Sequence, residues 1–309
     1  MKLHGVLHVT AITGDAPRNV DFYARVLGLR LVKKTVNQDD PTVYHLFYAD
    51  EKGSAGADIT FFEYPHARRG RAGAGMVHRI TWRVASEEAL EFWEQRLGAA
   101  GVETSREDRH LSFADPEGLD LELALVESND EPLVARSPEI PVEHALQGFD
   151  GVRAYCDDPE RSRPLLEETL AFEPQVTDCY KVGGERRESW YRYDEPPSEP
   201  GIGGAGTVHH VAWASLPDEH GAWQQRVARA GARPTEIIDR FYFKSIYFRE
   251  PSGVLFEIAT IGPGFTVDED PEHLGERVSL PPAFEHLREQ LEKTLTPLPD
   301  PRARLAEQR

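Results

Sequence analysis

The sequence predicts an α+β fold of four βαβββ modules, because one pattern of residues recurs along the chain. The pattern is a strand, an amphipathic helix that ends near a glycine, and further strands, with an acid-Pro-x-Gly turn before the last strand. Residues 77–123 and 209–258 match each other best, since each has histidine in its first strand and glutamate in its last. Their turns read Asp115-Pro116-Glu117-Gly118 and Glu250-Pro251-Ser252-Gly253.

Two weaker copies complete the set. The module that opens the chain starts with the strand Leu7–Ile12, and its helix has Pro17 in the first turn and ends at Gly28. The third module starts at Gly151–Tyr155, and its helix begins at Pro159.

The modules predict a division of the chain into two halves. We expect residues 1–140 to form an N-terminal pair of modules and residues 141–309 to form a C-terminal pair. A final helix, Ala283–Leu295, has leucines at i, i+4 and i+8, and it is expected to pack back on the body of the protein ahead of a tail.

Composition excludes two classes of partner. The 309 residues include 53 acidic and 35 basic side chains, a net charge of −18, which disfavours binding to nucleic acid. No apolar run approaches the roughly 18–20 residues that a membrane helix needs. With only two cysteines, Cys156 and Cys179, we expect a reducing, cytoplasmic setting. A homo-oligomer is plausible.

Alternation along the strands brings polar side chains to one face. In the last strand of the fourth module, Glu257 lies on the face opposite Phe256. In the first strand of that module, His210 shares a face with Ala212, whereas His209 falls on the other face.

The first strand of the chain offers a second histidine, His8, on the same face as Thr10. Two histidines and one glutamate directed into a concavity match the facial triad that binds Fe(II) or a similar ion. A lone histidine on a strand is more often structural, but the recurrence of His and Glu within one module favours a metal site.

The second module carries a similar pair, His78 and Glu122. This pair is either a second metal site or a remnant of duplication. The third module has Gly151, Val152 and Arg153 where a second histidine would be needed. We therefore interpret His78 and Glu122 as vestigial or structural.

Several segments resemble the vicinal-oxygen-chelate superfamily, which includes glyoxalase I, bleomycin-resistance proteins and extradiol dioxygenases. The segments are residues 8–10, 206–212 and 247–260, with residues 31–39 and 44–50 adding to the match. The closer similarity is to dioxygenases that open para-hydroquinones. It implies two vicinal-oxygen-chelate domains with a C-terminal helix, and an Fe(II)-dependent, extradiol-type dioxygenase that cleaves hydroquinone- or catechol-type rings with O2.

The resemblance also implies roles for individual residues. His8, His210 and Glu257 would bind Fe(II), or alternatively Mn(II). His209, Tyr247 and Arg240 align with active-site residues: His209 as an acid or base, Tyr247 as a hydrogen-bond donor to an oxygen, and Arg240 as a partner for an anionic ring. Arg240 and Tyr247 differ in strand parity, so one of them should come from a turn or a neighbouring strand.

One residue departs from the family pattern. Members that cleave hydroquinone can carry His-His in the first strand, where this chain has Leu7-His8. Leu7 removes an acid/base group or a substrate contact at that position.

Two other functions fit the same fold. A glyoxalase-type isomerase or lyase would use Ni(II) or Zn(II) and four ligands, for which the first module offers only Glu63. A non-catalytic protein that binds an aromatic antibiotic would hold no metal.

The ligand positions predict how the modules pair. Two modules close into one metal-holding cup, so ligands from the first and fourth modules imply that these two pair, leaving the second with the third. The competing hypothesis is pairing in sequence order.

Overall fold

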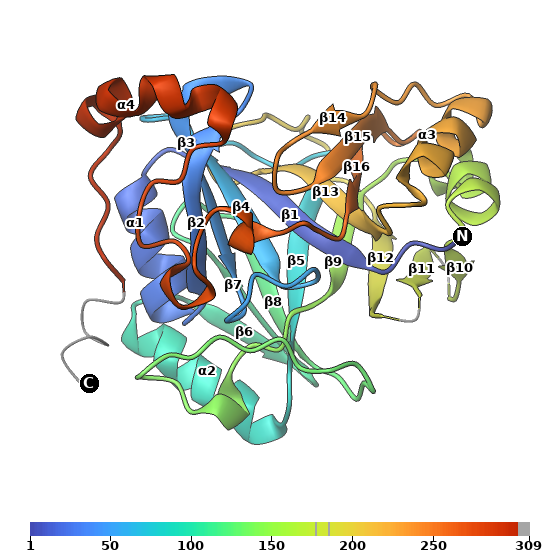
Figure 1. Ribbon diagram of the computed structural model, residues 1–309. Helices are drawn as coiled ribbons and strands as arrows, with labels where there is room; N and C mark the ends of the chain where they lie inside the picture. Colours follow the sequence, from blue (N-terminus) through green and yellow to red (C-terminus); the bar gives the residue numbers. More distant parts are fainter. Residues whose placement is uncertain (177, 185, 302–309) are drawn as a thin grey trace.

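The computed structural model describes residues 1–176, 178–184 and 186–301, so the end of the expected tail lies outside the described residues. It contains the four predicted modules (Figure 1). The first comprises β1 (Val6–Thr13), α1 (Ala16–Val20), η1 (Asp21–Val26), β2 (Arg30–Asn37), β3 (Asp40–Ala49) and β4 (Asp58–Glu63). The second comprises β5 (Val77–Val84), α2 (Glu87–Ala99), β6 (Thr104–Glu107), β7 (His110–Ala114) and β8 (Asp120–Leu125).

The second half of the chain repeats this order. After η2 (Val142–His144), the third module comprises β9 (Phe149–Tyr155), η3 (Pro159–Arg161), η4 (Pro164–Thr169), β10 (Glu173–Pro174), β11 (Cys179–Gly183) and β12 (Glu188–Asp194). The fourth comprises β13 (Val208–Ser215), α3 (His220–Arg229), β14 (Ile238–Asp239), β15 (Lys244–Arg249) and β16 (Leu255–Thr260). The C-terminal segment contains η5 (Phe265–Val267), η6 (Pro271–His273), η7 (Pro282–Leu287) and α4 (Arg288–Thr294).

Local sequence explains where the helices begin and how they pack. Ser86 caps α2 by accepting a hydrogen bond from Ala89 N at 3.2 Å, and Trp93 is among the residues that this helix buries. The helices expected in the first and third modules are shorter than predicted and widen into the π-helices η1 and η4. The C-terminal helix forms as expected, and its Leu291 packs with Val36 of β2.

The strands form two eight-stranded sheets, and their order settles how the modules pair. One sheet runs β14-β15-β16-β13-β1-β4-β3-β2, and the other runs β10-β11-β12-β9-β5-β8-β7-β6. The first module therefore pairs with the fourth and the second with the third, as the ligand positions predicted. The predicted division into residues 1–140 and 141–309 follows the order of the modules along the chain. Each sheet combines one module from each half, so the division into two separate pairs stays a prediction.

Two kinds of apolar core surround the sheets. The larger cluster combines residues of both sheets with the buried faces of the helices, including Tyr23, Trp93 and Trp223. A smaller cluster lies within the first sheet's cup and includes Leu7 and Phe243. Among the described residues, no helix is long and apolar enough to cross a membrane.

Two β-bulges interrupt the antiparallel pairing of β1 with β13 at the centre of the first sheet. Leu7 is the extra residue in β1, directly before His8, and His209 is the extra residue in β13, directly before His210. A bulge turns neighbouring side chains away from strict alternation, and bulges are common beside active sites. The two bulges occupy equivalent places in the first and fourth modules.

Candidate metal centre

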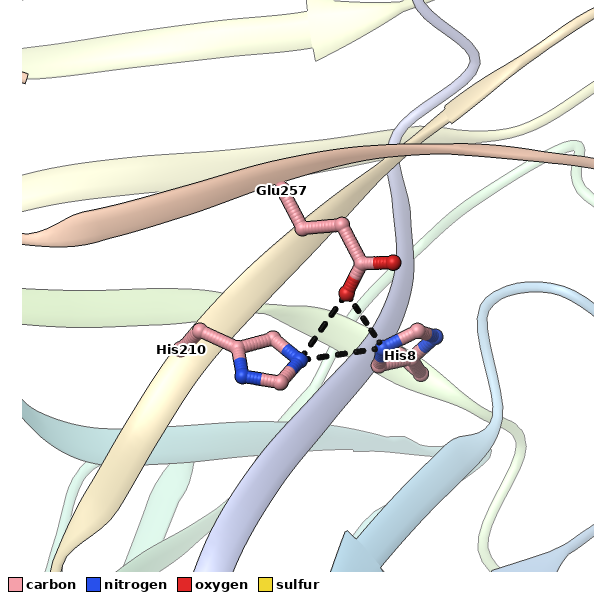
Figure 2. Close-up of side chains that lie close together, drawn as sticks. All are labelled: His8, His210 and Glu257. Carbon is pink, nitrogen blue, oxygen red and sulfur yellow. Dashed lines mark hydrogen bonds and ion pairs between the residues drawn. The ribbon is translucent and has the colours of Figure 1, made fainter. Parts of the chain in front are cut away.

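Three side chains from three adjacent strands converge in the cup of the first sheet (Figure 2). His8 lies on β1, His210 on β13 and Glu257 on β16. The Oε2 atom of Glu257 lies 3.0 Å from His8 Nε2 and 2.9 Å from His210 Nε2, and the two Nε2 atoms are 3.3 Å apart. All three residues are at most 3% exposed.

Each of these groups changes the pKa of the others. Burial raises the pKa of the Glu257 carboxyl, but the two histidines outweigh it and hold this pKa well below its usual range. Burial lowers the pKa of His8, and the Glu257 carboxylate more than compensates, so the net change is upward. For His210 burial dominates and the pKa falls.

The donor set fits a divalent cation of the kind that prefers nitrogen and carboxylate ligands. Two imidazole Nε2 atoms and one carboxylate oxygen meet at one point, which is the ligand set of the facial triad. The second carboxylate oxygen of Glu257, Oε1, is buried and has no hydrogen-bond partner among the described residues. Buried acceptors of this type are normally satisfied, and an ion bound here would satisfy this group.

The first module supplies no fourth carboxylate ligand. In the fourth module, Glu257 pairs with Ala212 across β16 and β13. The equivalent pair in the first module is Thr60 with Thr10, and their hydroxyl oxygens lie 2.9 Å apart. Glu63 lies at the far end of β4, where it accepts a hydrogen bond from a threonine of the C-terminal segment at 2.9 Å. The candidate centre therefore offers three protein groups that could hold a metal ion.

A cavity opens onto His8 and His210. Its wall combines aromatic rings with amide, hydroxyl and charged groups, from the following residues besides His8 and His210: Thr35, Asn37, Gln38, Asp39, His45, Phe47, Phe62, Arg240, Tyr242, Phe243 and Tyr247. A concave site of this composition, mostly apolar with a few polar groups, suits a small aromatic molecule.

Arg240 and Tyr247 meet in this cavity from different elements. Tyr247 lies on β15 opposite Glu257, and its ring is 5.6 Å from the His210 ring. Arg240 lies in the turn between β14 and β15, so the expectation that one of the two comes from a turn is confirmed. The Arg240 guanidinium lies 5.5 Å from the centre of the Tyr247 ring. Burial, followed by the charge of Glu257, raises the pKa of Tyr247.

A tight turn and an ion pair fix Arg240. Phe241, the next residue, has φ of 68°, a conformation that bulky residues rarely adopt. Asp39, at the β2–β3 hairpin of the first module, accepts two hydrogen bonds from the guanidinium at 3.0 and 2.8 Å. Burial alone would lower the pKa of Arg240, but the Asp39 carboxylate raises it, so the side chain stays charged.

His209 lies beside the centre but outside the ring of residues that line the cavity. Its Nδ1 atom contacts His210 Nδ1 at 2.8 Å, and its ring is 5.5 Å from that of Phe62. Partial burial and the neighbouring His210 lower the pKa of His209 to about 4. Strict alternation predicted that His209 would share a face with Val211; this was wrong because His209 is the bulged residue.

Sequence reasoning gave no role to His45, which lies on β3 within the cavity wall. Its Nε2 atom is 2.8 Å from Thr60 Oγ1, and its ring packs between Phe47 and Phe62. Burial, followed by repulsion from the other histidines, holds its pKa well below the usual value. The available signal was its alternation with Phe47, which places both side chains on the inner face of β3.

The second cup is built on the same register, but its described residues form no comparable group of metal ligands. Glu122 pairs with Thr81 as Glu257 pairs with Ala212, which puts Arg79 in the place of His210. The Arg79 guanidinium donates to Glu122 at 3.3 Å, so an arginine supplies the positive charge here.

The two other positions of the second cup also differ from a metal site. His78 corresponds to His209 and not to a ligand, and its Nε2 atom lies 2.8 Å from Asp194. Gly151 stands in the place of His8. The interpretation of His78 and Glu122 as vestigial or structural therefore agrees with the geometry of the described residues.

We expect Glu122 to stabilise the fold in a way that depends on pH. Burial raises its pKa, but His110, Thr81 and Arg79 together lower it from 4.5 to about 2. A carboxyl with a depressed pKa stabilises the fold above pH ~4.5, and this contribution is lost as the pH falls toward 2. We expect Glu122→Gln to lower the free energy of unfolding at pH 7 by about 3 kcal/mol, at 1.36 kcal/mol per pKa unit.

Urea unfolding at pH 7 and at pH 3 measures this difference. The difference in the free energy of unfolding between the wild type and Glu122→Gln should be smaller at pH 3 than at pH 7. The control Glu103→Gln, at an exposed position, should be as stable as the wild type at both pH values. A gap that stays constant with pH would contradict the charge-based account.

Comparisons with known proteins agree with this architecture. The model of the Glyoxalase/Bleomycin resistance protein/Dioxygenase superfamily matches residues 5–123 and 148–258. A Bacillus subtilis protein provisionally named ring-cleaving dioxygenase MhqA is 39% identical over 96% of this chain and 100% of its own. The chlorohydroquinone/hydroquinone 1,2-dioxygenase of Sphingobium indicum is 33% identical over 95% of this chain and 96% of its own.

Solved structures show the same fold. A crystal structure from Bacillus subtilis, provisionally described as a dioxygenase, has a TM-score of 0.90 at 39% identity and covers 96% of this chain and 98% of its own. Glyoxalase I from Zea mays has a TM-score of 0.59 at 16% identity, covering 83% of this chain and 92% of its own, and it supports the fold alone.

Proposed function

This chain belongs to the Glyoxalase/Bleomycin resistance protein/Dioxygenase superfamily, and from that premise we propose that it is an Fe(II)-dependent ring-cleaving dioxygenase of the extradiol type. Its substrates would be O2 and a small aromatic of the hydroquinone or catechol type. One ring carbon–carbon bond next to a hydroxylated carbon would break, and both oxygen atoms would enter the product.

The observation that carries the proposal is the three-ligand centre of His8, His210 and Glu257. These three residues would hold the ion and would leave part of its coordination sphere free for substrate. A four-ligand lyase centre is disfavoured because Thr60 occupies the place of the fourth carboxylate. Bound Fe(II), or alternatively Mn(II), would supply Lewis acidity and redox chemistry.

The side chains around the centre would bind and orient the ring. Arg240, held by Asp39 and charged at neutral pH, would pair with an ionised ring oxygen. Tyr247 keeps its proton, because its pKa is raised, and can donate a hydrogen bond to an oxygen of the substrate or of O2. Phe47 and Phe62 would exclude water from the two faces of the pocket.

His209 was expected as an acid or base, and in our proposal it acts next to His210. The contact between their Nδ1 atoms fixes the orientation of the ligating ring. With its pKa lowered to about 4, His209 is neutral at pH 7, so its Nδ1 atom can accept a hydrogen bond from the Nδ1–H of a ligating His210, and its Nε2 atom carries the proton that an acid would donate. We also propose a cytoplasmic location, because Cys156 and Cys179 are buried free thiols.

Oxygen uptake tests the proposal. Protein loaded anaerobically with Fe(II) is mixed with hydroquinone, chlorohydroquinone, methylhydroquinone or catechol in an oxygen electrode, and the metal content is measured in parallel. We expect one O2 consumed for each ring opened. Conversion of the hemithioacetal of methylglyoxal and glutathione without O2 would indicate the lyase. Tight binding of aromatics by metal-free protein, with no turnover, would indicate the resistance function.

Asp39 provides a test of how the substrate is held. Asp39→Asn is expected to raise KM up to about fivefold with little change in kcat, since an exposed ion pair contributes roughly 0.2–1 kcal/mol to fixing Arg240. Asp40→Asn, in the same hairpin but bonded to Thr42, is the matched control. Steady-state kinetics at saturating O2 measure both. An equal KM in both variants and the wild type would contradict a positioning role for Asp39.

A further inference from the structure

We propose that Asp58 is the positioning residue for His8, accepting a hydrogen bond from His8 Nδ1, directly or through one water. The inference rests on the proposed function, because it concerns how one ligand of that centre is oriented. A histidine that binds a metal through Nε2 carries its proton on Nδ1, and a carboxylate or carbonyl usually accepts this proton. The two histidine ligands of this chain differ in how they meet that need.

His210 has such a partner and His8 does not. The Nδ1 atom of His210 contacts the bulged residue His209. The equivalent bulged residue before His8 is Leu7, whose side chain cannot accept a hydrogen bond. Accordingly, His8 Nδ1 is buried and has no hydrogen-bond partner within the described part of the chain. A buried N–H without a hydrogen-bond partner destabilises the fold, so a partner is expected.

Asp58 is placed to serve as that partner. It begins β4 and pairs directly with His8 across the parallel β1–β4 ladder, so both side chains project from the same face of the sheet. Asp58 is only 2% exposed, and its Oδ1 atom is likewise buried without a partner in the residues that the structure describes. Two complementary unsatisfied atoms therefore lie on neighbouring residues.

Space for a bridging water exists beside Asp58 and near the His8 ring. A cavity of about 420 Å³ is lined by Asp58, Leu7 and Phe243, and the Phe243 ring lies 5.2 Å from the His8 ring. A water needs only roughly 10–15 Å³ and two to four polar partners. The fold itself does not require an acidic residue at this position. In the fourth module the equivalent neighbour of His210, found by continuing the register of β13 with β16 by one residue, is Leu255.

Metal affinity tests the inference without using turnover. Fe(II) is titrated anaerobically into metal-free protein in competition with a chromophoric chelator. Asp58→Leu is expected to weaken Fe(II) binding by about 10-fold or more, as loss of a ligand's hydrogen-bond partner does elsewhere. Asp58→Asn keeps an acceptor oxygen, so its affinity for Fe(II) should fall less than that of Asp58→Leu. Glu63→Gln, at the other buried end of β4, is the matched control and should bind as the wild type does.

A second substitution provides the rescue. Leu7→His in the Asp58→Leu background recreates the arrangement seen at His209 and His210 and should restore most of the lost affinity. Unchanged affinity in Asp58→Leu, a loss shared by Glu63→Gln, or a loss that Leu7→His leaves unaltered would each overturn the inference. If Asp58→Leu does not fold, Asp58→Ala, which also removes the acceptor, decides by the same titration.

These outcomes separate the inference from the proposed function. Normal Fe(II) binding and oxygen uptake by the wild type, together with normal binding by Asp58→Leu, would refute only the role of Asp58. A wild-type chain that binds no Fe(II) would refute both.

Discussion

His210→Ala is expected to abolish metal binding and to lower oxygen uptake by more than about 100-fold. Loss of a group that merely supports a metal ligand costs roughly 10–100-fold, and His210 is one of the three proposed ligands. The substitution also leaves Glu257 buried with a single histidine neighbour, so the remaining pair holds a cation poorly.

The measurement combines metal analysis with an oxygen-uptake trace at saturating hydroquinone. His286→Ala, an exposed position on η7, serves as the control and should retain metal and turnover. Circular dichroism establishes that His210→Ala is folded. A folded His210→Ala protein that keeps a full equivalent of iron would show that His210 is not a ligand.

Removal of the metal should have an equally large effect. Dialysis against a strong chelator is expected to reduce oxygen uptake to the background rate, and Fe(II) added without air should restore it. Ni(II) and Zn(II) should occupy the same ligands, since imidazole and carboxylate groups accept them, yet neither should restore oxygen consumption. The centre would then be both metal-dependent and selective in its chemistry.

The control for this experiment is stripped protein carried through the same steps with buffer alone. Undiminished ring cleavage by protein shown to be metal-free would contradict the proposed function. Restoration of isomerase or lyase activity by Ni(II) or Zn(II) would instead favour the glyoxalase-type alternative.

The sequence alone could predict the four modules and the convergence of His8, His210 and Glu257. Each prediction depends on a short-range signal: the repeated acid-Pro-x-Gly turn, and a period of two along the strands. The three proposed ligands come from the first and fourth modules. Because ligands of one ion must lie close together, these two modules were predicted to pair. The strand order of the structure agrees with this pairing.

Features that depend on contacts between modules could not be predicted in the same way. A bulge changes the direction of side chains only through the register with the partner strand, so the positions of Leu7 and His209 required that register. The bonds from Arg240 to Asp39 join residues 201 positions apart, and neither residue carries a local signal of the contact. Arg79 corresponds to the proposed ligand His210 only through the strand pairing of each sheet, which the sequence does not reveal.

The pairing of β1 with β13 at the centre of the first sheet determines when that sheet can form during synthesis. The second and third modules are contiguous in the chain, so their sheet can close as soon as residue 194 has left the ribosome. β1 emerges first of all and must wait for about 200 further residues before β13 can cover its open edge. Because such distant pairings form late, that edge of β1 stays open in the nascent chain, and the proposed metal site can form only near the completion of translation.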